Sequence, residues 1–270
     1  MEQISNSEYR SREGISSSDV KGWVDAVSPK HWKHKQSENT DNDKFRIGRV
    51  FHSLVLENIE PIIFQEPINE KTGKAYGYET KKYLEAKKNF EELNATEYIT
   101  STERAKMEPM REALIKEFGQ YLTCRGFNER SFFAQCPDTG MKVKCRPDRI
   151  AGATIFDLKT CDDIGRFEID VKKWGYHIQA AFYSDVFELA TGKKPDKFIF
   201  MAVEKREPFD TCLYELSAEY FEIGRIQYKK AMKEMKACQE SGNFPGVMGD
   251  NPVLTIDAPY WLWKQEMGEV

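Results

Sequence analysis

The stretch Lys142–Thr160, KVKCRPDRIAGATIFDLKT, limits what this chain can fold into more than any other part of the sequence. It predicts two short β-strands, Lys142–Ile150 and Ala153–Thr160, joined by a tight turn around Gly152. Two strands so closely connected are expected to pair, so we expect a β-sheet near the centre of the fold.

Three charged side chains belong to this predicted hairpin. Side chains alternate between the two faces of a strand, so Asp157 and Lys159 are expected on the same face. Asp148 comes from the end of the preceding strand. Two carboxylates and one ammonium group are therefore expected to converge at one edge of the sheet.

Such a trio fits metal-dependent cleavage of a phosphodiester. Carboxylate oxygens are hard ligands that suit Mg²⁺ or Mn²⁺. A bound divalent ion lowers the pKa of a water molecule and neutralises charge on the reacting phosphate. A nearby lysine can orient or deprotonate that water, or stabilise the oxyanion. Ordinary ion pairs on edge strands show the same Asp-x-Lys spacing, so other motifs must decide between the two interpretations.

The composition allows a substantial core. The chain has 270 residues, of which 40% are hydrophobic and 13% aromatic. No apolar run approaches the ~18–20 residues of a membrane span, and the polar start lacks the apolar region of a signal peptide. We therefore expect a cytoplasmic protein without a membrane partner, and Met1 favours a complete chain.

Charge and cysteine usage narrow the function further. The net charge of −4 argues against a simple basic DNA-coating protein, although a nuclease can concentrate its basic residues in one channel. Six cysteines occur, but none forms a C-x-x-C pair. Reduced thiols and no zinc site are expected.

Hydrophobic periodicity predicts a mixed sheet flanked by helices. Helices are expected from about residue 19 to Val27 and at about 45–56, 79–93, 102–118, 174–190 and 218–239. Further strands are expected at 128–135, 197–203 and 209–216. Residues 1–14 are expected to be partly ordered at most, and 36–44 to form a loop. One domain over 1–270 is predicted, with an N-terminal segment to 45, a core over 46–240 and an extended tail over 241–270.

Four motifs in this order carry a family resemblance. CRPD (Cys145–Asp148) followed by FDLKT (Phe156–Thr160) resembles the signature of the PD-(D/E)xK nucleases. QAAFY (Gln179–Tyr183) is similar to the Q-x-x-x-Y motif of the RecB-like branch. GRVFHSLVLE (Gly48–Glu57) is similar to the upstream helix of that branch, and the segment Ile15–Trp32 resembles the start of the RecE exonucleases (exonuclease VIII). The resemblance implies a restriction-endonuclease-like α/β core.

The resemblance also implies a ligand set and a catalytic lysine. Asp148 and Asp157 would ligate Mg²⁺, with Mn²⁺ as a substitute, and the Leu158 carbonyl would add a ligand. His52 would complete the metal shell. Lys159 would be the catalytic lysine.

Three further residues are expected around this centre. Gln179 and Tyr183 lie one helical turn apart and would position the DNA phosphates or the lysine. Glu129, in the strand before the predicted hairpin, matches an acidic residue of the fold that holds water or a second metal. Some RecB-like relatives carry four clustered cysteines for an iron–sulfur cluster. This chain lacks that cysteine pattern, so no cluster is predicted.

Three basic or aromatic segments have two open interpretations. The run Lys30–Lys35 is either a DNA-facing patch or a solvated turn. Lys172, Lys173 and Trp174 are candidates for contact with a DNA strand. The Tyr260–Trp263 cluster is expected to serve packing or a subunit interface, with base stacking as the alternative.

The resemblance predicts an exonuclease that resects duplex DNA ends, in the 5′-to-3′ direction, to leave single strands for recombination. It also implies a bacterial or phage origin, a ring-shaped homo-oligomer (trimer or tetramer) and a RecT-like single-strand-annealing recombinase as partner. Two alternatives stay open. One is a metal-dependent endonuclease or single-strand nuclease. The other is a non-catalytic protein that binds DNA ends on the same fold.

Overall fold

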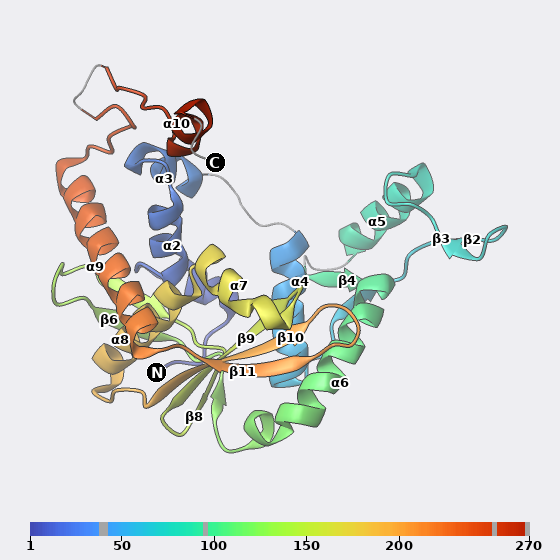
Figure 1. Cartoon of the computed structure of the whole chain (residues 1–270). Helices are drawn as coiled ribbons and strands as arrows, with labels where there is room; N and C mark the ends of the chain where they lie inside the picture. Colours follow the sequence, from blue (N-terminus) through green and yellow to red (C-terminus); the bar gives the residue numbers. More distant parts are fainter. Residues whose placement is uncertain (38–42, 94–96, 250–252, 268–270) are drawn as a thin grey trace.

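A five-stranded mixed sheet forms the centre of the computed structural model, which describes residues 1–37, 43–93, 97–249 and 253–267 (Figure 1). The strands lie in the order β11–β10–β9–β8–β5. Their bounds are Phe127–Asn128 (β5), Arg149–Ala151 (β8), Thr154–Cys161 (β9), Lys197–Glu204 (β10) and Thr211–Glu215 (β11). Within this sheet β9 and β10 run parallel, and the other neighbouring pairs are antiparallel. The predicted mixed α/β fold is confirmed.

Helices cover both faces of the sheet (Figure 1). Their bounds are Asn6–Ser11 (α1), Ser17–Asp25 (α2), Pro29–Gln36 (α3), Asp43–His52 (α4), Lys81–Leu93 (α5), Ser101–Thr123 (α6), Phe167–Lys173 (α7), Tyr176–Thr191 (α8), Ala218–Ser241 (α9) and Tyr260–Met267 (α10). A π-helical turn, Ser53–Glu57, follows α4, and a 3₁₀ turn, Ile164–Arg166, precedes α7. Among the described helices, none is long and apolar enough to cross a membrane.

Three small two-stranded sheets complete the strands. They pair Ile62–Phe64 (β1) with Tyr98–Thr100 (β4), Ile68–Asn69 (β2) with Lys74–Ala75 (β3), and Phe132–Gln135 (β6) with Lys142–Cys145 (β7). The β6–β7 hairpin packs against α8, on the side of the sheet where α2 and α9 also lie.

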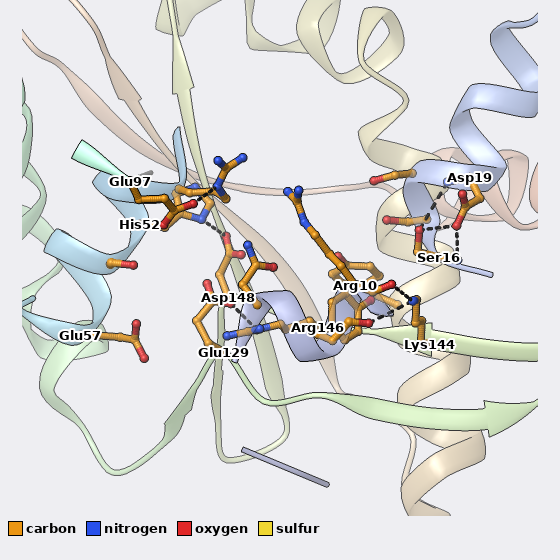
Figure 2. Close-up of a pocket in the computed structure, with 17 residues that line it drawn as sticks. Arg10, Ser16, Asp19, His52, Glu57, Glu97, Glu129, Lys144, Arg146 and Asp148 are labelled. Atoms are coloured by element: carbon orange, nitrogen blue, oxygen red, sulfur yellow. Dashed lines mark hydrogen bonds and ion pairs between the residues drawn. The ribbon is translucent and has the colours of Figure 1, made fainter. Parts of the chain in front are cut away.

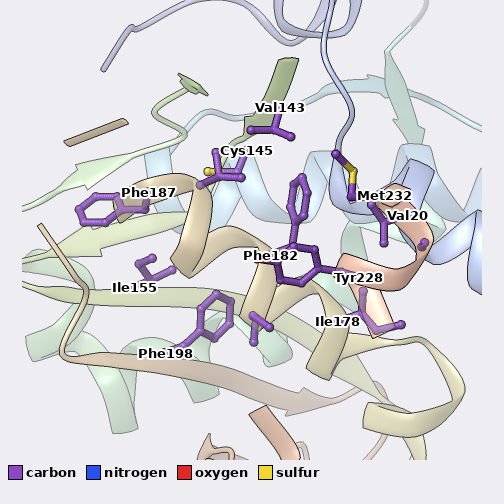
Figure 3. Packing of buried hydrophobic residues seen from close by; sticks show 14 of the residues in the cluster. Val20, Val143, Cys145, Ile155, Ile178, Phe182, Phe187, Phe198, Tyr228 and Met232 are labelled. Carbon is purple, nitrogen blue, oxygen red and sulfur yellow. The ribbon is translucent and has the colours of Figure 1, made fainter. Parts of the chain in front are cut away.

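The core lies in two layers because side chains alternate along β9 and β10. Ile155 and Phe200 face the layer that α2, α8 and α9 cover, which includes Phe182 and Met232 (Figure 3). Leu158 and its neighbours face a second layer, formed with α4 and α6. The close contact between α8 and α9 depends on Gly224, where a Cβ atom would lie 2.2 Å from the His177 carbonyl oxygen.

Two predicted strands are wrong because each is broken in the middle. The strand predicted over 142–150 divides into β7 and β8 at Pro147, which has no N–H to donate to a strand partner. The strand predicted over 128–135 divides into β5 and β6 at Glu129, whose φ of 50° is left-handed. In both cases the two pieces join different sheets. The predicted pairing across the turn at Gly152 is confirmed for β8 and β9, which are antiparallel neighbours.

The N-terminal segment is more ordered than predicted. Residues 6–11 form α1, and Glu2 exchanges backbone hydrogen bonds of 2.9 Å with Ser131. The run Lys30–Lys35 lies in α3, which begins with Pro29, a residue suited to the first helical position. It is therefore helical rather than a turn. Most of the loop predicted over 36–44 lies outside the described residues.

The predicted helices of the core are confirmed, with small shifts at their ends. Ser217 caps α9 as expected, since its hydroxyl accepts a hydrogen bond of 3.1 Å from the Tyr220 N–H. Thr100 and Glu103 form a capping box at the start of α6. The tail, predicted as extended, contains α10, whose Tyr260 and Trp261 side chains are exposed.

Candidate active site

The first part of the site lies on β9 and α8. Asp157 is 1% exposed and forms an ion pair with the Lys159 ammonium group. The Gln179 side-chain amide donates a 2.7 Å hydrogen bond to Asp157 Oδ1, and its Oε1 atom accepts one of 3.4 Å from Lys159 Nζ. We call Asp157, Lys159 and Gln179 the lysine cluster. It brings together three residues that the sequence motifs predicted.

The protonation states in this cluster follow from burial and pairing. Burial alone would lower the pKa of Lys159, but Asp157, Tyr176 and Asp148 together outweigh burial and raise it. The Lys159 ammonium group also lies 4.7 Å from the centre of the Tyr176 ring. Burial raises the pKa of Asp157, and repulsion from Asp148 adds to this rise, although Lys159 opposes both. Lys159 is therefore protonated and positively charged at neutral pH.

The second part of the site joins three separate segments. Ligand atoms of His52, Glu129 and Asp148 all lie within 4.8 Å of one another. His52 Nδ1 lies 3.4 Å from Asp148 Oδ2, and the Leu158 N–H donates a 2.7 Å hydrogen bond to the same oxygen. We call His52, Glu129 and Asp148 the acidic cluster. The Leu158 contact holds it against β9, next to the lysine cluster.

Backbone contacts explain why these distant segments meet. The Glu129 N–H donates a 3.0 Å hydrogen bond to the Asp148 carbonyl, which fixes the two residues side by side. The Asn128 side-chain amide donates to the Leu56 carbonyl and so ties β5 to the π-helical turn that follows His52. The π-helical turn is a local departure of a kind that is frequent at functional sites.

The acidic cluster has strongly shifted pKa values. Burial would lower the pKa of His52, but Asp148 and Glu129 outweigh it and raise this pKa to about 9. Burial raises the pKa of Glu129 to about 7, with repulsion from Asp148 as the second cause. Burial also acts to raise the pKa of Asp148, but His52 and Lys159 lower it overall. Ionisable groups with shifted pKa values that lie this close together are typical of functional sites.

The acidic cluster opens into a cavity of about 570 Å³ (Figure 2). Figure 2 shows His52, Asp148 and Glu129 on one side of this cavity, and Arg10 and Lys144 on the other. Tyr183, one turn after Gln179, also borders it. Both signs of charge line each side of the cavity, because Arg49 comes from α4 and Asp19 lies on the same side as Arg10 and Lys144.

Two basic residues of this cavity were missed by sequence reasoning. Arg146 Nε lies 2.7 Å from Glu129 Oε2, so the guanidinium group partly neutralises the acidic cluster. Lys144 Nζ donates to the backbone carbonyls of α1, including Tyr9 at 3.0 Å, so it fixes the N-terminal segment. Arg146 directly precedes the Pro-Asp pair, and this position is the sequence signal that could have identified it.

The donor set suits a hard divalent cation. Glu129 and Asp148 offer carboxylate oxygens, which Mg²⁺ and Mn²⁺ prefer, and His52 adds an imidazole nitrogen, a ligand typical of transition metals. The structure gives Leu158 a defined contact through its N–H. Coordination by its carbonyl stays a prediction, as do the individual roles of the other site residues.

A comparison with known families identifies the family of this chain. Residues 16–252 match the model of a family described as a PDDEXK-like domain of unknown function (DUF3799). The chain belongs to this family. The PDDEXK-like match includes every residue of the two clusters, and it supports the predicted PD-(D/E)xK nuclease.

A solved structure supports the same fold. A crystal structure of a candidate exonuclease from Eubacterium rectale matches over 100% of both chains, with a TM-score of 0.65 and 16% identity. At this identity the likeness shows the PDDEXK-like fold. An alkaline exonuclease from Laribacter hongkongensis is 14% identical, covering 74% of this chain and 95% of its own, but its TM-score of 0.31 is too low to support an argument. A search of curated proteins finds no match to the chain.

Proposed function

We propose that this protein is a Mg²⁺-dependent exonuclease that resects duplex DNA ends. The observation that carries the proposal is the junction of the two clusters at β9. There the Leu158 N–H hydrogen bond joins Asp148 of the acidic cluster to the strand that bears Asp157 and Lys159. A divalent-ion site and a charged lysine beside it are the two components that in-line cleavage of a phosphodiester needs.

The acidic cluster would hold the metal. His52, Glu129 and Asp148 supply donor atoms that all lie within 4.8 Å of one another. Asp157 and the Leu158 carbonyl are further expected ligands. Bound Mg²⁺, or Mn²⁺ in its place, would lower the pKa of a bound water and neutralise charge on the phosphate. His52 must lose its proton to serve as a ligand, and Asp148 must stay ionised.

The lysine cluster would position the charge that acts on the reacting group. Gln179 contacts both Asp157 and Lys159, so it fixes the lysine in one place. A lysine with a raised pKa stays protonated, which suits orientation of water and stabilisation of the oxyanion better than proton abstraction. Tyr183 borders the cavity and would contact a phosphate of the strand.

Digestion of end-labelled linear duplex tests this proposal. The wild-type protein should degrade the linear duplex with Mg²⁺ and leave a closed circle intact. Lys159→Ala should abolish degradation, whereas Lys197→Ala should not, because Lys197 is an exposed lysine paired with Glu215 on the sheet surface. No Mg²⁺-dependent loss of linear DNA would overturn the proposal. Cutting of the circle would favour an endonuclease, and binding without cleavage a non-catalytic role.

The finer features of the proposal rest on the resemblance to the RecE exonucleases. They are 5′-to-3′ polarity, a ring of three or four subunits, a RecT-like annealing partner and action in the cytoplasm. A ring would place basic groups of several subunits along one channel, which would reconcile DNA binding with the net charge of −4. Native mass and digestion of duplexes blocked at one end would test the first two features.

A further inference from the structure

Lys21 on α2 reaches the same aromatic ring as the lysine of the proposed active site. Its Nζ atom lies 6.0 Å from the centre of the Tyr176 ring, and Lys159 Nζ lies 4.7 Å from it. The neighbouring Val20 is fully buried beside Ile178 and Met232, which anchors this turn of α2 in the core (Figure 3). Lys21 is thus held near the lysine cluster by the fold.

The chain leaves room for the Lys21 side chain at Gly175. A Cβ atom at Gly175 would lie only 3.0 Å from Lys21 Cδ and 3.2 Å from its Cγ. Gly175 also has a φ of +62° and precedes the first turn of α8, where Tyr176 lies. The glycine therefore permits the helix start and the path of the lysine stem together.

Lys21 differs from Lys159 in its charge balance. Lys159 is paired with Asp157, whereas in the part of the chain that the structure describes no carboxylate forms an ion pair with Lys21. Asp157 and Asp25 act on Lys21 from longer range, and burial with repulsion from Lys159 lowers its pKa to about 8. A mostly enclosed ammonium group without a carboxylate partner is unfavourable for folding, so an anion from outside the chain would complete it.

The position of α2 indicates which anion this is. Ser17, Ser18 and Asp19, at the start of α2, line the cavity of the acidic cluster. Lys21 follows within one turn and lies toward the lysine cluster. A nucleic-acid strand that runs from the acidic cluster to the lysine cluster would therefore pass the start of α2 and then Lys21.

We propose that Lys21 binds a backbone phosphate of the DNA strand next to the one that is cleaved. This inference rests on the proposed nuclease function and adds a second cationic contact to it. The alternative is a structural role, in which the Lys21 charge stabilises the fold through Tyr176. The two roles predict opposite effects when the charge is removed and the stem is kept.

Lys21→Met is the decisive variant, because methionine keeps an unbranched stem beside Gly175. Binding of a fluorescent duplex with a recessed end is measured by anisotropy, with Ca²⁺ in place of Mg²⁺, over a series of salt concentrations. We expect binding about 10-fold weaker or more, since a hydrogen bond to a charged group is lost. The slope of log affinity against log salt should fall by about 0.7–0.9, as for one phosphate contact. The thermal midpoint of unfolding should stay equal or rise.

Two further variants control this result. Lys21→Arg should keep the wild-type salt slope, because it keeps the charge. Lys197→Met, which removes an exposed charge paired with Glu215, should leave binding within about 2-fold. Wild-type affinity and slope in Lys21→Met would overturn the inference, and so would a Lys21→Met protein that unfolds early or fails to fold. A wild-type protein that neither binds nor cleaves duplex DNA would instead contradict the proposed function itself.

Discussion

The lysine cluster and the acidic cluster are joined by the hydrogen bond from the Leu158 N–H to Asp148, but their buried charges are balanced in different ways. Asp157, Lys159 and Gln179 form a closed set in which every partner comes from the chain. The acidic cluster joins two carboxylates and an imidazole whose pKa values are displaced from their ordinary range. The Asp157–Lys159 ion pair balances the charges of the first cluster within the chain, although Asp157 is also an expected metal ligand, whereas the second cluster has the charge pattern of a site completed by a cation.

This difference predicts that the two clusters can be inactivated separately. Loss of the lysine should remove chemistry without removing metal binding. Loss of the histidine should weaken metal binding and, through it, chemistry.

Lys159→Met should give the largest loss of activity. A preorganised charge at the reacting phosphate contributes about 10²–10³-fold, and a positioned proton-transfer group about 10²–10⁴-fold, so we expect cleavage to fall by about 10³-fold. The increase in thermal midpoint that Mg²⁺ causes should persist, because the acidic cluster is intact. Single-turnover cleavage and thermal unfolding with and without Mg²⁺ check both parts. Loss of the Mg²⁺ effect in this variant would show that the clusters are one unit.

His52→Ala should act through the metal. We expect severely impaired cleavage at low Mg²⁺, a half-saturating Mg²⁺ concentration raised by at least about 10–100-fold, and partial recovery at high Mg²⁺. Its side chain is about one-quarter exposed, so the fold should survive. A Mg²⁺ titration of the cleavage rate, with circular dichroism as the control for folding, measures this. Near-normal activity would show that the metal shell does not include His52.

The free energy of unfolding without metal should fall as pH rises, whereas the stabilisation by Mg²⁺ should grow. The pKa of His52 rises from about 6.5 in the unfolded chain to about 9 in the fold. Its contribution, on the order of 2 kcal/mol after allowance for solvent screening, is present below pH 6.5 and lost as pH rises to about 9. Glu129, with a pKa of about 7, adds a loss that begins above about pH 4.5.

The metal-free thermal midpoint should therefore fall between pH 6.5 and 9 more than in His52→Gln. The increase caused by Mg²⁺ should grow over the same range, because the ligands bind metal only after they lose their protons. Thermal scans in a chelator and in saturating Mg²⁺ give both curves. A Mg²⁺ effect that is constant with pH would contradict the assignment of the ligands.

The same contrast explains how far the sequence could predict the site. Asp157 and Lys159 share one strand, so alternation alone placed them on one face. His52 and Glu129 reach Asp148 through a π-helical turn and a left-handed residue, which no periodic pattern encodes. Their positions were predicted only through the resemblance to a family.

Other errors have similar causes. Pro147 interrupts a stretch that looks like one strand, because the sequence of Lys142–Ile150 alternates without showing that its two ends join different sheets. Lys21 gave no signal, since a lysine in a short amphipathic helix is normally a solvent-exposed residue. Its position depends on Gly175, which is distant in the sequence and contacts it only after folding.

We expect the smallest difference in cleavage rate between variants of Gln179 and Tyr183, which share one face of α8. Gln179→Ala removes the contacts that orient both Asp157 and Lys159, so cleavage should fall by about 10-fold or more. Among the described residues, the Tyr183 hydroxyl makes no such hydrogen bond to either cluster, and Tyr183→Phe should cost less than about 5-fold, within the range of one hydrogen bond. Cleavage rates of the two variants under saturating Mg²⁺ measure this order. If Tyr183→Phe had the larger effect, the strand would be aligned mainly from the cavity wall, and the lysine cluster would depend on bound DNA for its geometry.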